Sequence, residues 1–244
     1  MSLYNQILLK NFKFLGIKSN ANVLDVGCGN GDVVHKLLMD GFNSFGIDLE
    51  FKEGNKKREL LSNERIKLID IGVQTRKSLN EGNIYSWPNF KIKFDVVISK
   101  AVIEHVRNFE EFVGSIKMVL KNHEGICIHY YPSKYSLIEQ HTGVFLGSII
   151  QSRIWFLIMC QLGLCFKSKR KKGDEAFSYM QNYTFFRSQK EIDSEFKKQG
   201  FKKLKCIQVL SCHPRKILRL IGLLPFANTL FGILRSKVAV YKRI

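Results

Sequence analysis

Short apolar runs alternate with segments of helical spacing along the first half of the chain. Nearly continuous apolar runs are typical of strands buried on both faces of a sheet, whereas apolar residues three or four apart indicate helices. Strands are expected at 21–26, 42–49, 94–99 and 125–130, with another inside 63–93, and helices at 3–17, 32–40, 51–62 and 109–120. Asn30 or Asp32 is expected to cap the second helix. The alternation predicts an α/β domain with a mostly parallel, doubly wound sheet.

The last part of the chain predicts a different pairing. Ser188 followed three residues later by Glu191 has the spacing of a capping box, so a helix is expected from there to Gly200. Strands are expected at 201–210 and 238–241, and Pro132 is expected to end the strand before them. Because no long crossover helix separates these two strands, they indicate an antiparallel strand at one edge of the sheet.

Two segments fall outside this plan, within what we expect to be one domain over 1–244. Residues 144–166 are apolar and long enough to span a bilayer by count, but Arg153 interrupts them, and an arginine at the centre of a span costs ~3 kcal/mol. A helical lid over 141–187, inserted after the fifth strand, is therefore favoured. Residues 213–236 predict a second, amphipathic insertion.

The charge of the chain indicates an anionic partner but does not identify which kind. Lys and Arg total 39 against 21 Asp and Glu, a formal net charge of +18. This suits nucleic acid, a phosphorylated substrate or an anionic membrane, and equally a lysine-rich solvated surface. In 213–236 the basic residues lie among aliphatic ones, which favours peripheral contact with the inner face of a membrane over stacking on bases. The first residues lack a signal-peptide pattern, so a cytoplasmic location is expected.

The six cysteines predict thiols rather than a metal centre. None forms a CxxC pair, and no His/Cys spacing resembles a zinc site. Most lie in apolar runs, which favours buried, reduced side chains. No metal site is predicted.

A turn with three alternate glycines follows the first expected strand. Gly27, Gly29 and Gly31 stand between that strand and a helix, where α/β sheets bind nucleotides. A dinucleotide turn would need a third glycine where Asp32 stands, and a carboxylate there would repel pyrophosphate. Asp25 inside the strand and Asp48 at the end of the next one favour a cationic cofactor without phosphate that carries a ribose.

Three stretches resemble motifs of class I S-adenosylmethionine-dependent methyltransferases. They are VLDVGCGNG, GIDLE and FDVVISKAVIEHV, and the likeness is greatest to the broad group that includes ubiquinone- and menaquinone-pathway enzymes. The resemblance covers about 20–132, and 184–210 more loosely. It implies S-adenosylmethionine as cofactor and a Rossmann-like, seven-stranded sheet.

The resemblance also implies which residues bind that cofactor. The methionine end would lie on Asp25 and on the turn Gly27, Cys28, Gly29, Asn30 and Gly31. Asp48 would bind the ribose, Leu49 would lie against the adenine, and Asn83 with Ile84 would contact the adenine amino group. Ser99 and Lys100 would line the side from which the methyl leaves.

Candidates for the acceptor side follow the fourth and fifth strands. His105 could touch substrate or only hold its loop, and Glu104 shares that ambiguity. Residues 132–143 resemble the pattern P-x-x-[YF]-S-x-x-E-x-H-x-G of methyltransferases that act on glycans and small metabolites. In it Glu139 and His141 could form a general base or a hydrogen bond that stabilises the loop.

Together these features predict methyl transfer to a small-molecule, glycan or lipid-linked acceptor, with oxygen favoured over nitrogen or carbon. An RNA-directed methyltransferase and a cofactor-binding module without catalysis remain as alternatives. The amide-methylating tetrapeptide N/D-P-P-Y/F is absent after the fourth strand, where Ser99 to Val102 stand instead.

Overall fold

A computed structural model describes residues 3–48, 66–68, 90–166, 173–213, 215–224 and 226–244. The helix expected at 51–62 and the cofactor residues Leu49, Asn83 and Ile84 lie outside the described residues.

One seven-stranded sheet forms the centre of the molecule, in the order β3-β2-β1-β4-β5-β7-β6. The five strands β3, β2, β1, β4 and β5 pair in parallel. Strand β7 runs antiparallel to both of its neighbours, β5 and β6, and β6 is the strand at that edge of the sheet. The mostly parallel sheet and the antiparallel edge are thus confirmed. The strands are β1 Asn22–Val26, β2 Asn43–Asp48, β3 Ile66–Leu68, β4 Val96–Lys100, β5 Ile126–Pro132, β6 Phe201–Leu204 and β7 Ser236–Arg243.

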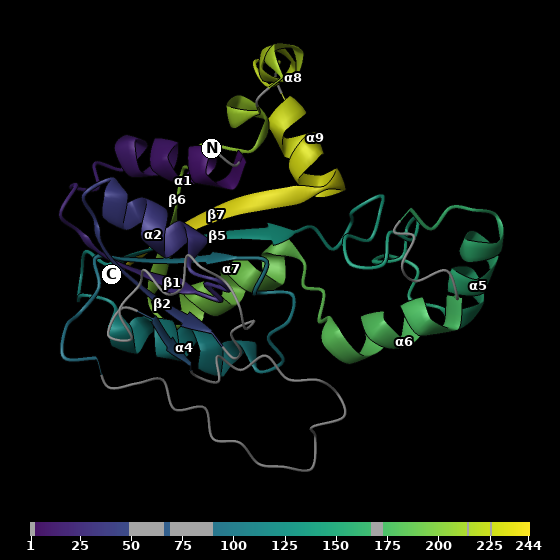
Figure 1. Cartoon of the computed structure of the whole chain (residues 1–244), viewed down its shortest axis with the longest axis horizontal. Helices are drawn as coiled ribbons and strands as arrows, with labels where there is room; N and C mark the ends of the chain where they lie inside the picture. The colour runs from purple at the N-terminus through teal and green to yellow at the C-terminus, as the bar shows by residue number, and fades with distance from the viewer. Residues whose placement is uncertain (1–2, 49–65, 69–89, 167–172, 214, 225) are drawn as a thin grey trace.

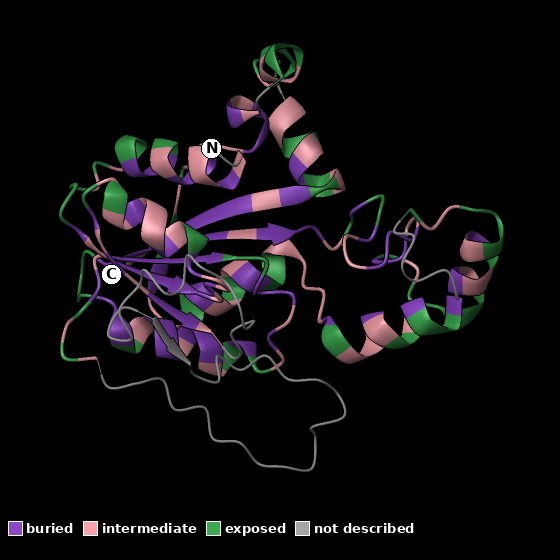
Figure 2. Cartoon of the chain, in the orientation of Figure 1, coloured by how far each residue is buried: buried purple, intermediate pink, exposed green. Residues whose placement is uncertain are grey.

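Helices cover both faces of the sheet (Figure 1). On one face lie α1 Leu3–Phe14 and α2 Asp32–Met39, and on the other α4 Phe109–Val119 and α7 Gln189–Lys198. Successive strand residues point to opposite faces, so Val97 packs with α4 and α7 while Ile98 packs with α1. The apolar run of β4 is continuous because both of its faces are buried, as the buried strands in Figure 2 show.

Three local expectations were wrong or incomplete. Gly31, with φ 77°, is the N-cap of α2 and no side chain caps it, so Asn30 and Asp32 do not have the predicted role. The strand expected at 125–130 continues to Pro132, which pairs with Ser236 and ends β5 as expected. The strand expected over 201–210 ends at Leu204, and a 3-10 helix η2 follows at Leu210–Cys212. By contrast, the capping box of Ser188 and Glu191 is confirmed.

The two insertions are helical. Within 141–187, α5 Arg153–Gln161 and α6 Gly173–Tyr183 pack around Phe156 and Met180 and extend beyond the carboxyl end of β5 (Figure 1). Within 213–236, α8 Lys216–Ile221 and α9 Ala227–Leu234 stand out from the sheet. Among the helices described, none combines the length and apolarity needed to cross a membrane.

Candidate active site

The predicted chemistry gathers at the carboxyl ends of the parallel strands. The strand order changes direction between β1 and β4, since β2 and β3 lie to one side of β1 while β4 and β5 lie to the other. Open α/β sheets bind ligands outside the carboxyl ends of the strands at such a switch point. The glycine turn after β1, Asp48 at the end of β2 and the loops after β4 and β5 all belong to this edge.

Glycines are required in this turn and beside it for two separate reasons. Gly27, Gly29 and Gly31 have φ of 73°, 55° and 77°, a left-handed region that other residues enter at a cost. Gly46, on the neighbouring β2, is required for space, because a Cβ there would lie 2.6 Å from the Sγ of Cys28. The N–H of Gly27 donates to the carbonyl of Ile47 at 2.8 Å, so β2 holds the turn in place.

Two carboxylates lie beside this turn in different environments. Asp48 accepts a hydrogen bond from the N–H of Gly29 at 2.6 Å. Asp25 is only 2% exposed, and burial together with the Asp48 charge raises its pKa to about 8, with the Lys100 ammonium opposing the rise. Lys100 also lies over the ring of Tyr4, 5.3 Å from the centroid, which brings α1 to the site. The sequence did not indicate a role for Tyr4 at this site, because Tyr4 lies within the apolar pattern of α1.

Ser99 and Lys100 point to opposite faces of the sheet. The hydroxyl of Ser99 is buried and lies 2.7 Å from Nδ1 of His129, among the aromatic side chains of the α4 and α7 face. Burial lowers the pKa of His129 to about 3, so this imidazole is neutral. The side chain of Ser99 therefore does not line the methyl-transfer side as predicted, whereas that of Lys100 is exposed at the end of β4.

Four side chains from two loops, all predicted for the acceptor side, meet in the structure. Nε2 of His105 lies 3.2 Å from Nε2 of His141. Nδ1 of His141 is 2.7 Å from Oε1 of Glu139, and Nδ1 of His105 is 2.6 Å from the carbonyl oxygen of Tyr183. Oε1 of Glu104 is 3.9 Å from Nε2 of each histidine. All the predicted acceptor-side residues are thus brought together, although the sequence did not show that the histidines touch.

Hydrogen bonds fix both loops. Arg187 donates to the carbonyls of Ile103 and Arg107, and the N–H of Phe185 donates to the carbonyl of Glu104 at 2.6 Å. The second loop is a tight hairpin in which the N–H and hydroxyl of Thr142 donate to Glu139. The segment after α6 therefore positions the loop after β4, a role of Arg187 that nothing in the sequence indicated.

The hydrogen bonds also determine which ring nitrogens carry protons. A carbonyl oxygen only accepts, so Nδ1 of His105 must donate to Tyr183. Burial alone would raise the pKa of Glu139, but the hydrogen bonds from His141 and Thr142 outweigh it and lower that pKa to about 2. Glu139 is therefore ionised, and Nδ1 of His141 donates to it. In the neutral rings both Nε2 atoms then present lone pairs to the same space.

At the fourth side chain, Glu104, burial is not outweighed by hydrogen bonds as it is at Glu139. Glu104 is 3% exposed, and burial raises its pKa to about 7. Neither of its carboxylate oxygens has a hydrogen-bond partner among the described residues. Burial lowers the pKa of His105, because for an imidazole it is the protonated form that carries the charge.

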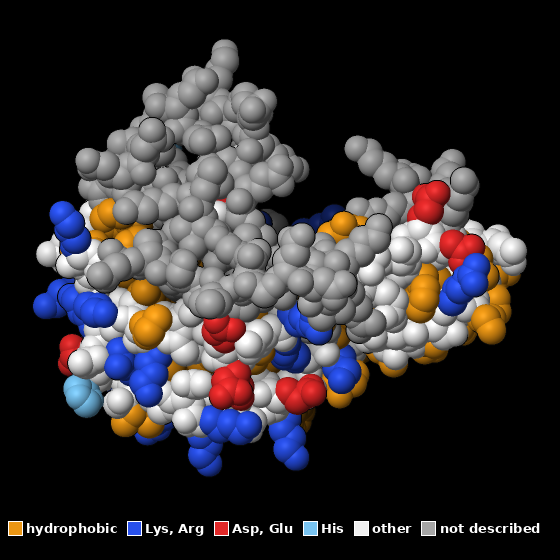
Figure 3. Space-filling model, turned by 90° about the horizontal axis from the view of Figure 1, so that it is seen from below, with side chains coloured by type: hydrophobic (Ala, Val, Ile, Leu, Met, Phe, Trp, Pro, Cys, Tyr) orange, Lys and Arg blue, Asp and Glu red, His pale blue; other side chains and the backbone are white. Residues whose placement is uncertain are grey.

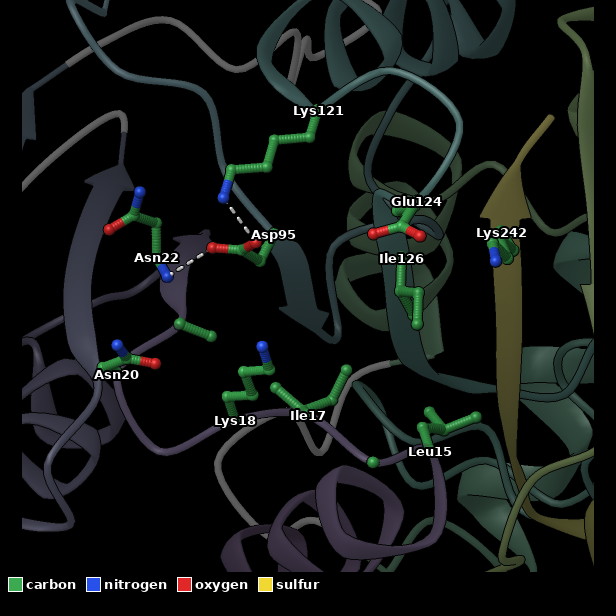
Figure 4. A pocket seen from close by; sticks show the side chains of 12 residues that line it. Leu15, Ile17, Lys18, Asn20, Asn22, Asp95, Lys121, Glu124, Ile126 and Lys242 are labelled. Atoms are coloured by element: carbon green, nitrogen blue, oxygen red, sulfur yellow. Dashed lines mark hydrogen bonds and ion pairs between the residues drawn. The ribbon is translucent and has the colours of Figure 1, made fainter.

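A separate pocket lies at the amino ends of the parallel strands, opposite to the ends that carry the candidate site (Figure 4). It has a volume of about 560 Å³ and lies at the amino ends of β1, β4 and β5, beside Asn22, Asp95 and Ile126. Asp95 is paired there with Lys121 and accepts from the N–H of Asn22, contacts that close the ends of the strands. This pocket contains none of the candidate site residues.

Comparison with known proteins decides the family. Residues 17–151, more than half of the chain, match a family model described as a methyltransferase domain. The chain belongs to the class I S-adenosylmethionine-dependent methyltransferases. Its cofactor is S-adenosylmethionine, and the glycine turn and the Asp48 carboxylate remain the residues predicted to hold it. Asp32 at the position of a third dinucleotide glycine, with Asp25 and Asp48 beside the turn, fits a cofactor without a pyrophosphate.

Two curated relatives each match less than half of the chain. A ubiquinone biosynthesis O-methyltransferase of Rickettsia prowazekii is 32% identical over 118 residues, which is 46% of this chain and 42% of that protein. Its counterpart in Pelagibacter ubique is 26% identical over 117 residues, 47% of this chain and 45% of that protein. The matched part of the chain thus spans less than half the length of these relatives.

Solved structures share the fold over nearly the whole chain. An S-adenosylmethionine-dependent methyltransferase from Mesorhizobium loti superposes with a TM-score of 0.58 at 12% identity, covering 96% of this chain and 98% of its own. Magnesium protoporphyrin IX methyltransferase from Synechocystis PCC 6803, with SAH bound, gives a TM-score of 0.51 at 10% identity over 99% and 83% of the two chains. At this identity the likeness shows the fold alone.

Proposed function

We propose that this methyltransferase acts on a hydroxyl group of a small-molecule, glycan or lipid-linked acceptor, and that His105 and His141 together take up the hydroxyl proton. The observation that carries the proposal is the 3.2 Å approach of the two Nε2 atoms, each with its own Nδ1 engaged as a donor elsewhere. Two lone pairs directed at one space attract a positive species. A base of this kind suits a hydroxyl, which must lose its proton to become a good nucleophile.

The reaction needs no further reactant. The acceptor oxygen forms a bond to the methyl carbon while the bond from that carbon to sulfur breaks. The sulfonium leaves as the neutral thioether S-adenosylhomocysteine. The hydroxyl proton moves into the space between the Nε2 atoms of His105 and His141, where the ionised Glu139 stabilises the resulting imidazolium.

Two observations support oxygen as the nucleophile and a small or lipid-linked acceptor. The curated relatives are named O-methyltransferases, and the residues that match the family model, 17–151, include Glu104 and His105. For RNA we would expect a basic stripe interleaved with aromatic side chains. On the described part of the face in Figure 3, Lys and Arg side chains are instead interspersed with acidic ones.

The test is transfer of a tritiated methyl group to fractionated lipids, glycans, small metabolites and RNA. We expect label in a fraction rich in hydroxyls, in a product that resists the mild base that cleaves methyl esters. Label confined to RNA would establish the RNA-directed alternative. Cofactor binding without label in any fraction would establish the non-catalytic one.

We also propose that the 213–236 insertion contacts an anionic membrane. No residue of α8 is buried, and Leu223 and Phe226 beyond it are 79% and 83% exposed (Figure 2). Arg215, Lys216 and Arg219 accompany them, and residues 196–244 contain no Asp or Glu. An exposed apolar surface with basic residues and no acids is complementary to an anionic leaflet.

The insertion is joined directly to the acceptor-side loop. The N–H of Leu137 donates to the carbonyl of Leu234 at 3.1 Å, and the N–H of Ser133 donates to the carbonyl of Arg235 at 2.9 Å. The side chain of Gln140, next to His141, also donates to Arg235. A membrane surface at α8 would therefore lie at one side of the catalytic edge, which favours a lipid-linked acceptor.

Vesicle sedimentation tests this contact. We expect the protein to sediment with phosphatidylglycerol vesicles at low salt and to remain in solution with phosphatidylcholine alone. The double change Leu223→Ser with Phe226→Ser should abolish sedimentation. The matched control Met118→Ser, an apolar residue 62% exposed on α4, should not affect it. Equal sedimentation of both variants would contradict the proposal.

A further inference from the structure

The acceptor-side cluster contains more donor atoms than a proton requires. Three lone-pair donors converge there: Nε2 of His105, Nε2 of His141 and Oε1 of Glu104. We infer that these three atoms bind a divalent transition-metal cation. This inference rests on the part of the proposed function that makes a hydroxyl the methyl acceptor; the cation would occupy the place between the histidines and would activate that hydroxyl in place of the histidine pair.

The distances fit a metal ion. The three atoms form a triangle with sides of 3.2, 3.9 and 3.9 Å. A point in its plane that is equidistant from the corners lies about 2.1 Å from each, which is the length of bonds from zinc to imidazole nitrogen and carboxylate oxygen. A cation at that point would meet all three donors at bonding distance.

The surroundings of the ligands are those of a metal centre. Metal-binding histidines usually donate their other ring nitrogen to a carboxylate or a carbonyl, which fixes the ring and its tautomer. Here Glu139 has that role for His141, and the carbonyl of Tyr183 has it for His105. Both Nε2 lone pairs are thereby directed inward in the form that a cation needs.

Glu104 is the independent observation that points to a ligand. Both of its oxygens are buried without a hydrogen-bond partner among the described residues. Within that same part of the chain, neither Glu104 nor Glu139 forms an ion pair with Lys or Arg, although the whole chain contains 39 of these residues. A buried carboxylate without a hydrogen-bond or cationic partner, as at Glu104, is costly. A divalent cation would offset that cost.

The donor set indicates which cations fit. Two imidazoles and one carboxylate suit Zn²⁺, Fe²⁺ or Co²⁺, whereas Mg²⁺ and Ca²⁺ prefer oxygen ligands. The side chains of His105 and His141 remain 20% and 16% exposed, so a further ligand can approach. An acceptor hydroxyl bound to the cation would lose its proton to water rather than to the histidines. The bond changes at the methyl carbon are the same as in the metal-free reaction.

Calorimetric titration of the full chain with Zn²⁺ tests the inference. We expect one Zn²⁺ per chain, with affinity at least about tenfold weaker in Glu104→Gln and in His141→Gln. The control His123→Asn, an exposed histidine in the turn before β5, should bind as the wild type does. Circular dichroism of each variant confirms that it is folded.

The possible results separate this inference from the proposed function. No Zn²⁺ binding, or Zn²⁺ binding that Glu104→Gln leaves unchanged, overturns the metal site. If methyl transfer also continues after chelation, the proposed function stands without the metal. Zn²⁺ binding that depends on Glu104, in a protein that methylates no fraction, supports the metal site and overturns the proposed function.

Discussion

The carboxylate of Asp48 accepts a hydrogen bond from the backbone N–H of Gly29 at 2.6 Å, across the gap between β2 and the glycine turn. The side chain predicted to bind the ribose thus also fixes the loop predicted to bind the methionine end. If both predictions hold, a single residue couples the two halves of the cofactor site.

Asp48→Ala is expected to weaken S-adenosylmethionine binding at least about tenfold, or ~1.4 kcal/mol. The change removes a ribose acceptor and releases Gly29 at the same time. Calorimetry measures the dissociation constant. Asp174→Ala, an exposed acid of α6 paired with Arg153, provides the control and should bind the cofactor normally. Wild-type affinity in Asp48→Ala would refute the ribose assignment.

Asp25 should make the cofactor-free protein less stable as pH rises from about 4 to about 8. Its pKa is about 8 in the folded chain against 3.8 for an unperturbed carboxyl, so the folded state binds the extra proton throughout that window. When the folded state binds more protons than the unfolded state, the free energy of unfolding falls as pH increases. Urea denaturation of the wild type and of Asp25→Asn measures this, and the stability of the variant relative to the wild type should grow across the window. A constant difference would show that Asp25 is ionised in the folded chain.

Gly46→Ala should destabilise the protein by about 1–3 kcal/mol and weaken cofactor binding. Its new methyl group would lie 2.6 Å from Cys28 Sγ and 2.9 Å from Val34, so the glycine turn must shift. Gly114→Ala in α4 is the matched control, since nothing lies within 4 Å of the position of its Cβ. There alanine should stabilise the helix by roughly 0.5–1 kcal/mol. Equal stabilities of the two variants in thermal unfolding would contradict the packing at Gly46.

Ser99→Ala should lower stability by about 1–3 kcal/mol, because it leaves the buried His129 without its hydrogen bond. Cofactor affinity should stay within about twofold of wild type, since the hydroxyl faces away from the cofactor. Denaturation and calorimetry on the same sample give both values. A large loss of affinity at unchanged stability would return Ser99 to the methyl-transfer side.

The sequence predicted the parts of this molecule that depend on local chemistry. The apolar run of β4 and the capping box of Ser188 and Glu191 involve neighbours in the chain, and both are found as expected. Ser99 was misassigned because residues that are adjacent in a strand point to opposite faces, so it could not line the same side as Lys100.

The acceptor-side cluster depends on contacts that no local pattern contains. His105 and His141 are 36 residues apart, and their contact requires the loop after β4 to meet a hairpin after β5. Arg187, which comes from the far end of the insertion, holds the first of these loops in place. The sequence therefore identified each side chain but not the convergence of their lone pairs.

The rate of methyl transfer in a single turnover tests the central claim most directly, measured with the hydroxyl acceptor for wild type and His141→Gln beside the dissociation constant of S-adenosylmethionine. We predict that the variant loses roughly a hundredfold or more in rate. Its cofactor affinity should stay within about twofold, because His141 lies on the acceptor side. A variant that transfers the methyl group as fast as the wild type would contradict the role assigned to the histidine pair.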